Sequence, residues 1–217
     1  MFEKIRKMGM KSMKRLHNDK AFDTAIKSQN TEEFKQLLQK FESPVYLPST
    51  LAQDNLKEMT SAWLEYISGD KKAIRSINEF TYTAIFSGNV NLVKMAFDYG
   101  ADIDYQHGVL LRMACMHGNL DIVKLLLEKG GKIHAENEFG ETGLMLAIMN
   151  NRKEIISYLI EHGADLNYRS KTNKSIITQM SLYRQKDMMT WFLTHYSNLF
   201  TEENRKELQK SRLNLLF

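Results

Sequence analysis

Residues 114–130 read ACMHGNLDIVKLLLEKG, where two short apolar runs flank one glycine and a second glycine ends the unit. The spacing of the apolar residues predicts two helices. Gly118 and Gly130 can adopt the left-handed conformation that a tight turn and a helix end require. We therefore expect this stretch to fold as a helix, a tight turn and a second helix.

The same order of residues returns before and after this stretch. Gly88 precedes Gly118 by 30 residues, and Gly163 follows Gly130 by 33 residues. A fourth and weaker copy within residues 180–196 lacks both glycines. A period of about 33 residues predicts stacked helix pairs, each of which buries its apolar face against its neighbours.

Two tail motifs accompany the helix pairs, GADID at residues 100–104 and GADLN at residues 163–167. In these features the chain resembles the ankyrin-repeat family over residues 80–200. The resemblance implies an all-α solenoid of stacked helix-turn-helix units with short hairpin fingers and helical caps. The Thr-Pro-Leu-His opening of that family is absent, so the array is diverged, and it looks like ankyrin proteins of viruses, phages or intracellular bacteria.

The pattern also predicts how the chain is divided. Residues 1–20 form a basic leader, residues 21–79 hold an N-terminal capping repeat and atypical helical repeats, residues 80–200 hold the ankyrin repeats, and residues 201–217 form a C-terminal capping helix. Pro44 and Pro48 predict an extended connector inside the second of these segments, because proline denies a helix its backbone donor.

Charge and cysteine content limit the compartment and the partners. The formal net charge is +4, and residues 1–20 hold seven Lys or Arg against two acidic residues, so the remaining chain is nearly neutral. The lone cysteine, Cys115, predicts a reducing compartment, and no apolar run approaches the ~20 residues of a membrane helix. We expect a cytoplasmic protein, in the host cytoplasm if its source is a virus, phage or intracellular bacterium.

The irregular spacing predicts one short finger. The 30-residue step between Gly88 and Gly118 removes three residues from the link at 105–108, compared with the 33-residue step. The finger at this link should therefore be stubby. The finger at 137–141 should have full length.

No residue pattern typical of catalysis or metal binding is present. The sequence has no Gly-rich phosphate loop, no nucleophile elbow and no Cys/His cluster with zinc spacing. We therefore predict a protein that is not an enzyme and has no cofactor, no metal and no small-molecule substrate. His162 and His195 occupy the same position before successive turns, where a histidine can cap the last carbonyls of its helix.

Two sets of residues are candidates for binding a partner protein. In the ankyrin register, the two residues before each turn point to the concave face; they are Phe86, Ser87, Met116, His117, Met149, Asn150, Leu182 and Tyr183. The first of each pair is large and apolar, which is typical of an interface or of packing along the stack. The finger tips supply the second set: Gln106, His107, Glu138, Phe139, Glu141, Lys171 and Lys174.

Phe139 is the best anchor among these candidates, because an aromatic residue at a tip has little core to join. The tip charges change from acidic in the third repeat to basic in the fourth, which would orient a partner. The family resemblance implies a non-enzymatic module that binds a specific protein partner through its concave face. By analogy with ankyrin proteins of viruses, phages and intracellular bacteria, we expect it to inhibit a host defence or regulatory protein. The alternative is an adaptor that binds nucleic acid or an anionic membrane through residues 1–20, and its binding would collapse with salt.

Overall fold

A computed structural model describes residues 20–40, 56–68 and 74–214. The expected connector at Pro44 and Pro48 and nearly all of the basic leader lie outside these residues. The chain divides into two compact units, Met1–Ala101 (unit 1) and Asp102–Phe217 (unit 2). The four segments expected from the sequence remain a proposal.

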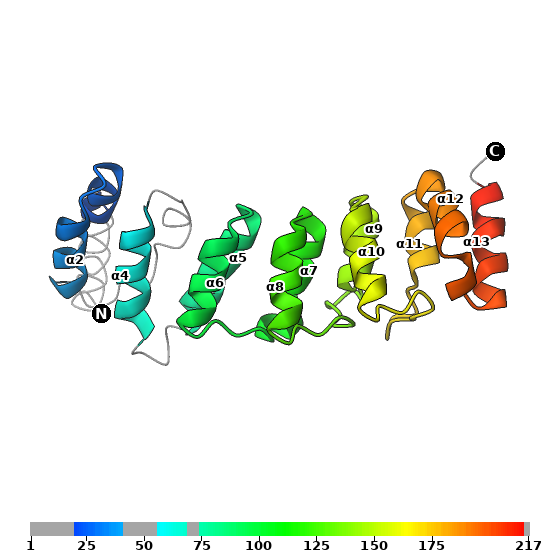
Figure 1. Ribbon diagram of the computed structural model, residues 1–217, viewed down its shortest axis with the longest axis horizontal. Coiled ribbons are helices and arrows are strands. Elements are labelled where there is room, and N and C mark those ends of the chain that lie inside the picture. The colour runs from blue at the N-terminus through cyan, green and yellow to red at the C-terminus, as the bar shows by residue number, and fades with distance from the viewer. Residues whose placement is uncertain (1–19, 41–55, 69–73, 215–217) are drawn as a thin grey trace, which may run out of the picture. The chain divides into compact units, whose positions relative to one another are not determined.

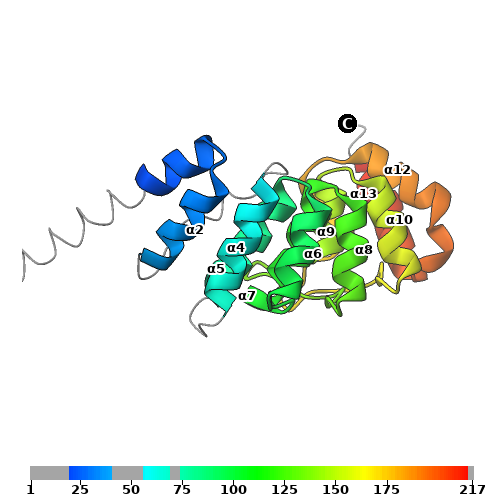
Figure 2. The ribbon, with the colours of Figure 1, turned by 60° about the vertical axis from the view of Figure 1, so that its left-hand side comes forward.

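Unit 1 contains helices that pack in pairs. Residues 20–27 are helical and are followed by α2 (Thr31–Lys40), α4 (Lys57–Ser68), α5 (Ile74–Phe86) and α6 (Val90–Asp98). Helix α2 packs on α4, and both α4 and α5 pack on α6 (Figure 2). Two aromatic contacts lie in this core, Phe22 with Phe34 and Trp63 with Phe80, with ring centroids 5.4 and 5.6 Å apart.

Unit 2 contains three helix pairs and a terminal helix. Its elements are α7 (Tyr105–His117), α8 (Leu120–Glu128), α9 (Gly143–Met149), α10 (Lys153–Glu161), α11 (Ile176–Leu182), α12 (Lys186–His195), the 3₁₀ turn η3 (Ser197–Leu199) and α13 (Glu202–Asn214). The pairs α7/α8, α9/α10 and α11/α12 follow one another (Figure 1). The first helices α7, α9 and α11 contact in sequence, and the part of the chain described contains no strand. The all-α fold predicted from the sequence is therefore confirmed.

In each helix pair of unit 2, the side chain just before the second helix forms a capping hydrogen bond. Asn119 accepts a hydrogen bond from the backbone N–H of Ile122 at 3.0 Å and so caps its own helix, α8. At the equivalent position Arg152 donates to the carbonyl of Met116 at 3.1 Å, and Gln185 donates to the carbonyl of Ile148 at 2.9 Å. These two side chains therefore cap the first helix of the preceding repeat instead of their own helix.

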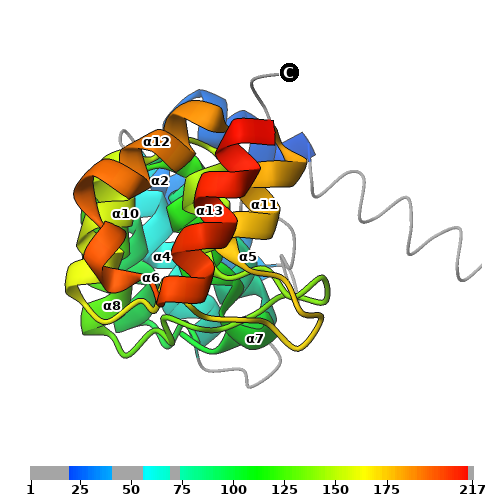
Figure 3. The same ribbon diagram turned by 90° about the vertical axis from the view of Figure 1, so that its right-hand side faces the viewer.

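The terminal helix α13 closes the end of unit 2. It lies alongside α11 and α12 (Figure 3), and Leu208 faces them as a fully buried side chain. Glu202, Glu203 and Lys206 are exposed and give α13 a polar outer surface. A helix that is apolar toward the stack and polar outside is typical of a capping element in a repeat array.

Asn167, which follows the helix pair α9/α10, connects this pair to the start of α13 by hydrogen bonds. Its side-chain amide donates to the carbonyl of Leu199 at 2.9 Å. Its side-chain oxygen accepts from the backbone N–H of Thr201 and from the side chain of Asn204, both at 2.9 Å. Because Asn204 is buried, these bonds fix how the cap sits on the stack.

Replacing Asn167 with Ala should loosen this cap. The substitution leaves the buried Asn204 amide without its acceptor, so we expect the free energy of unfolding to fall by about 1–3 kcal/mol in urea titrations. Asn198→Ala is the matched control, because Asn198 is exposed in η3. Equal effects of the two substitutions would contradict the assigned role of Asn167.

Cys115 lies where two first helices approach each other closely. A Cβ atom on Gly143 of α9 would lie 3.0 Å from the Cys115 Sγ atom, so the glycine permits this contact. Burial raises the pKa of the Cys115 thiol to about 12. The thiol is therefore protonated and shielded in the native protein.

We expect Cys115 to resist thiol-specific reagents in the folded protein at mildly alkaline pH, because only the thiolate is a good nucleophile and its formation requires a pH near 12. Labelling should follow the unfolding transition as urea is added. Labelling of the native protein at the rate of the unfolded chain would show that α7 and α9 do not pack as described.

Candidate protein interface

The link at residues 105–108, which stands at the position of the second finger, is a left-handed turn. Gln106, His107 and Gly108 have φ angles of 45°, 57° and 77°. Three consecutive left-handed residues reverse the chain in a space too short for a hairpin, which confirms the stubby finger predicted from the spacing. Position 108 requires glycine for two reasons. Its φ is positive, and an added Cβ would lie 3.0 Å from the Cβ of Ala135.

The buried side chain of Arg112 stabilises this turn. Its side chain is only 4% exposed, and its guanidinium donates to the carbonyl of His107 and, at 3.2 Å, to the carbonyl of Gln106. Burial lowers the pKa of Arg112, but an arginine keeps its charge in proteins. Two charge-assisted bonds therefore stabilise a backbone conformation that non-glycine residues rarely adopt.

The third finger is a rigid hairpin tip. The side-chain oxygen of Asn137 accepts from the backbone N–H groups of Phe139 and Glu141 at 3.0 and 2.9 Å. The N–H of Gly140, whose φ is 74°, donates to the carbonyl of Asn137 at 3.0 Å. These bonds hold the backbone on either side of Phe139, whose side chain is 66% exposed.

The fourth finger docks on the third. The Thr172 hydroxyl donates to the carbonyl of Phe139 at 3.1 Å, and a Cβ added to Gly140 would lie 2.1 Å from that hydroxyl oxygen. The Lys174 ammonium lies 3.7 Å from a carboxylate oxygen of Glu141 and 6.0 Å from the Phe139 ring centroid. The charges of Glu141 and Lys174, which were expected to orient a partner, thus pair with each other between the two fingers.

Glu136 is the main polar contact between these two fingers. Its carboxylate accepts from the Tyr168 hydroxyl at 2.5 Å and from the backbone N–H of Lys171 at 3.3 and 3.4 Å. This hydrogen bond, with burial and the negative charge of Glu136, raises the pKa of the Tyr168 phenol. The Tyr168 ring stacks on His134 with centroids 5.0 Å apart. No pattern in the sequence analysis singled out Glu136, His134, Tyr168 or Arg112.

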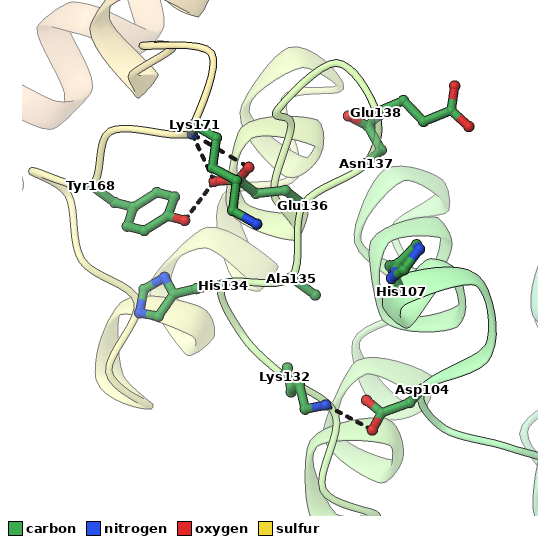
Figure 4. Close-up of a pocket in the computed structure, with 10 residues that line it drawn as sticks. All are labelled: Asp104, His107, Lys132, His134, Ala135, Glu136, Asn137, Glu138, Tyr168 and Lys171. Atoms are coloured by element: carbon green, nitrogen blue, oxygen red, sulfur yellow. Dashed lines mark hydrogen bonds and ion pairs between the residues drawn. The ribbon is translucent and has the colours of Figure 1, made fainter.

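An open groove of about 510 Å³ lies beside the short turn and the third and fourth fingers. Its lining residues are Asp104, His107, Lys132, His134, Ala135, Glu136, Asn137, Glu138, Tyr168 and Lys171. Figure 4 shows the third finger between the His107 turn on one side and Tyr168 with Lys171 on the other. Of the tip residues proposed from the sequence, the groove brings together His107, Glu138 and Lys171.

The residues predicted for the concave face differ in exposure. In unit 1, Phe86 is 66% exposed and Ser87 is exposed. In unit 2, Leu182 and Tyr183 at the end of α11 are 69% and 48% exposed, and Asn150 is exposed. Met116, His117 and Met149 are half-buried. The half-buried pair of methionines lies at the ends of the adjacent helices α7 and α9, so both of the explanations drawn from the sequence apply to them.

The histidines before the turns act as helix caps. The Nδ1 atom of His162 lies 2.8 Å from the carbonyl of Tyr158, and the Nδ1 atom of His195 lies 2.9 Å from the carbonyl of Trp191. The imidazole of each also stacks or tilts against the aromatic ring of the same partner. The capping role predicted from the sequence is therefore confirmed.

Among residues 20–40, 56–68 and 74–214, no group of three or more His, Cys, Asp or Glu side chains is placed to hold a metal ion. In the same residues no helix is both long enough and apolar enough to span a membrane.

The Arg112→Met variant tests how the short turn is held. Without the guanidinium, the carbonyl groups of Gln106 and His107 lose their hydrogen-bond donor. We therefore expect the free energy of unfolding to fall by about 2–3 kcal/mol in urea titrations. Arg112→Lys should recover only part of this loss, because an ammonium cannot form the two-pronged contact. Full stability of the methionine variant would show that the turn does not depend on Arg112.

Comparison with protein families gives two matches. A family model described as ankyrin repeats (3 copies) matches residues 111–203, and one described as ankyrin repeats (many copies) matches residues 82–127. Together these matches cover more than half of the chain. No curated protein matches the chain significantly. The matches include every helix pair of unit 2, and the chain therefore belongs to the ankyrin-repeat family.

Proposed function

We propose that this protein is a non-enzymatic module that binds one specific protein partner through two features of unit 2. The first is the helix-end strip, formed by Met116, Met149, Leu182 and Tyr183. The second is the finger row, which carries Phe139. Ankyrin repeats generally mediate protein–protein interaction, and this general role supports the proposal.

The exposed Phe139 ring is the observation that carries the proposal. A rigid aromatic side chain loses little conformational entropy on binding and can bury a large area. The Asn137 contacts already fix the backbone around it, so a partner would not have to order the loop. Leu182, 69% exposed at the end of α11, offers a second apolar anchor.

The kind of partner follows from the family resemblance. Ankyrin proteins of viruses, phages and intracellular bacteria act on host proteins, and the diverged repeats of this chain are similar to theirs. This similarity supports the more specific proposal that the partner is a host defence or regulatory protein, which the module inhibits in the host cytoplasm.

A second candidate function rests on the charge of residues 1–20. Seven basic residues against two acidic ones would attract nucleic acid or an anionic membrane. Binding of this kind weakens steeply with salt, because it depends on unscreened charge. Binding through Phe139 and Leu182 would persist, because burial of apolar surface does not need low salt.

Affinity capture from host lysate at low and high salt separates the two functions. We expect a protein partner to persist at high salt and in a variant whose seven Lys and Arg within residues 1–20 are replaced by Gln. The Phe139→Ser, Leu182→Ser double variant should lose the partner, because truncation of anchor residues typically costs about 2 kcal/mol or more each. Leu213→Ser is the matched control, because Leu213 is similarly exposed but lies on α13.

Capture that follows the basic residues and fades with salt would overturn the proposal and favour the adaptor. Capture that is lost equally in the Leu213→Ser control would show that the substitutions act through folding, and circular dichroism of each variant identifies this case.

A further inference from the structure

We propose that the gap left by the short second finger is the docking site for an extended segment of the partner protein that carries a Lys or Arg side chain. The segment takes the place that a full-length finger would occupy beside the third finger. This inference rests on the proposed function and specifies how the partner is recognised.

The contact between the third and fourth fingers shows how a finger docks on its predecessor. The fourth finger uses the Tyr168 hydroxyl and the Lys171 backbone N–H to bind Glu136, and the Thr172 hydroxyl to bind the carbonyl of Phe139. The contact between Lys171 and Glu136 thus uses the backbone N–H of Lys171 and not its ammonium group.

The equivalent positions of the third finger lie 33 residues earlier. They are Ala135, Glu138 and Phe139. No finger precedes them in unit 2, because the link at 105–108 is a tight left-handed turn. The residue equivalent to Glu136 in that link is Gln106, whose side chain donates to the Tyr105 hydroxyl at 3.1 Å. Gly108 of the short turn lies close to Ala135, whereas Glu138 and Phe139 at the tip of the third finger are exposed and have no preceding finger beside them.

The charges along the groove indicate which side chain would fill the gap. Asp104 is neutralised by Lys132 at 2.8 Å, whereas Glu136 accepts hydrogen bonds from neutral donors. Within the described part of the chain, neither Glu136 nor Glu138 forms an ion pair, and Lys171 is the one lysine of the lining that is left to oppose them. The groove therefore lacks one positive charge.

The directions of the two glutamates place this missing charge. In Figure 4 the Glu136 side chain turns toward Tyr168 and Lys171, and the Glu138 side chain extends away from them. Glu138 lines the groove, is exposed and forms no ion pair within the described residues, so a segment in place of the missing finger would need a basic residue to pair with it. The groove volume of about 510 Å³ lies within the usual range of binding sites, about 300–1,000 Å³.

Peptide titration tests the site without knowledge of the partner. The probe is a short peptide in which Lys alternates with Thr, and the control probe alternates Glu with Thr. We expect the lysine peptide to shift the backbone amide NMR signals of residues 104–108 and 132–139 of the ¹⁵N-labelled full-length protein, with saturation. The glutamate peptide should produce no such shifts.

Two variants make the test specific. Glu138→Lys should weaken binding of the lysine peptide by about tenfold or more, because the charge that it pairs with is reversed. Glu161→Lys makes the same change in net charge at an exposed site on α10 and should leave the affinity unchanged. Insertion of three residues between Gln106 and His107 restores the 33-residue step and should remove binding, because the chain then supplies its own finger.

Equal binding of both peptides, equal weakening by Glu138→Lys and Glu161→Lys, or full binding after the insertion would each overturn the docking site. The proposed function would survive these results if partner capture still required Phe139 and Leu182. Peptide binding at the groove together with capture that depends only on residues 1–20 would instead retain the site and reject its assignment to a protein partner.

Discussion

Burial between neighbouring helix pairs is the constraint on which unit 2 depends. A pair of short helices such as α9 and α10 has apolar side chains on more than one face and cannot cover them alone. The small side chains of Ala114 and Ala147, both fully buried, allow the first helices to approach each other. The end of the stack then needs a cover, and α13 supplies it with one apolar side and one polar side.

Most of the fold could be predicted from the sequence, because its signals are local. The helix pairs follow from apolar spacing, the turns from glycines, and the short second finger from a count of residues. Even where glycine is absent the turn keeps its geometry: Asn151 and Arg184 have φ angles of 56° and 53° at the turn positions of the third and fourth pairs. The contacts between repeats hold these residues in a conformation that costs energy for any side chain.

The candidate site was only partly predictable, because its contacts join residues about 30 positions apart. The exposure of Phe139 followed from its place at a tip. The roles of Arg112 and Glu136 could not be predicted. The role of Arg112 depends on its burial against the turn at 106–108, and the role of Glu136 depends on the contact between two fingers. The tip charges show the same limit: Glu141 and Lys174 pair with each other, so less of the charge faces outward than the sequence suggested.

The short finger connects the fold to the proposed function. The fourth finger docks on the third, whereas only a short turn precedes the third finger. Beside this short turn lie Glu138, which lines the groove, and the exposed ring of Phe139. Hydrogen bonds from Arg112 and the close approach of Gly108 to Ala135 hold the short turn in place.

Hydrogen–deuterium exchange of the full-length protein, free and in complex with a partner isolated by capture, tests this account most directly. The account predicts that the partner slows exchange in residues 104–108 and 132–141 and at the end of α11. Slower exchange confined to residues 1–20, or to the second helices α8, α10 and α12, would contradict it.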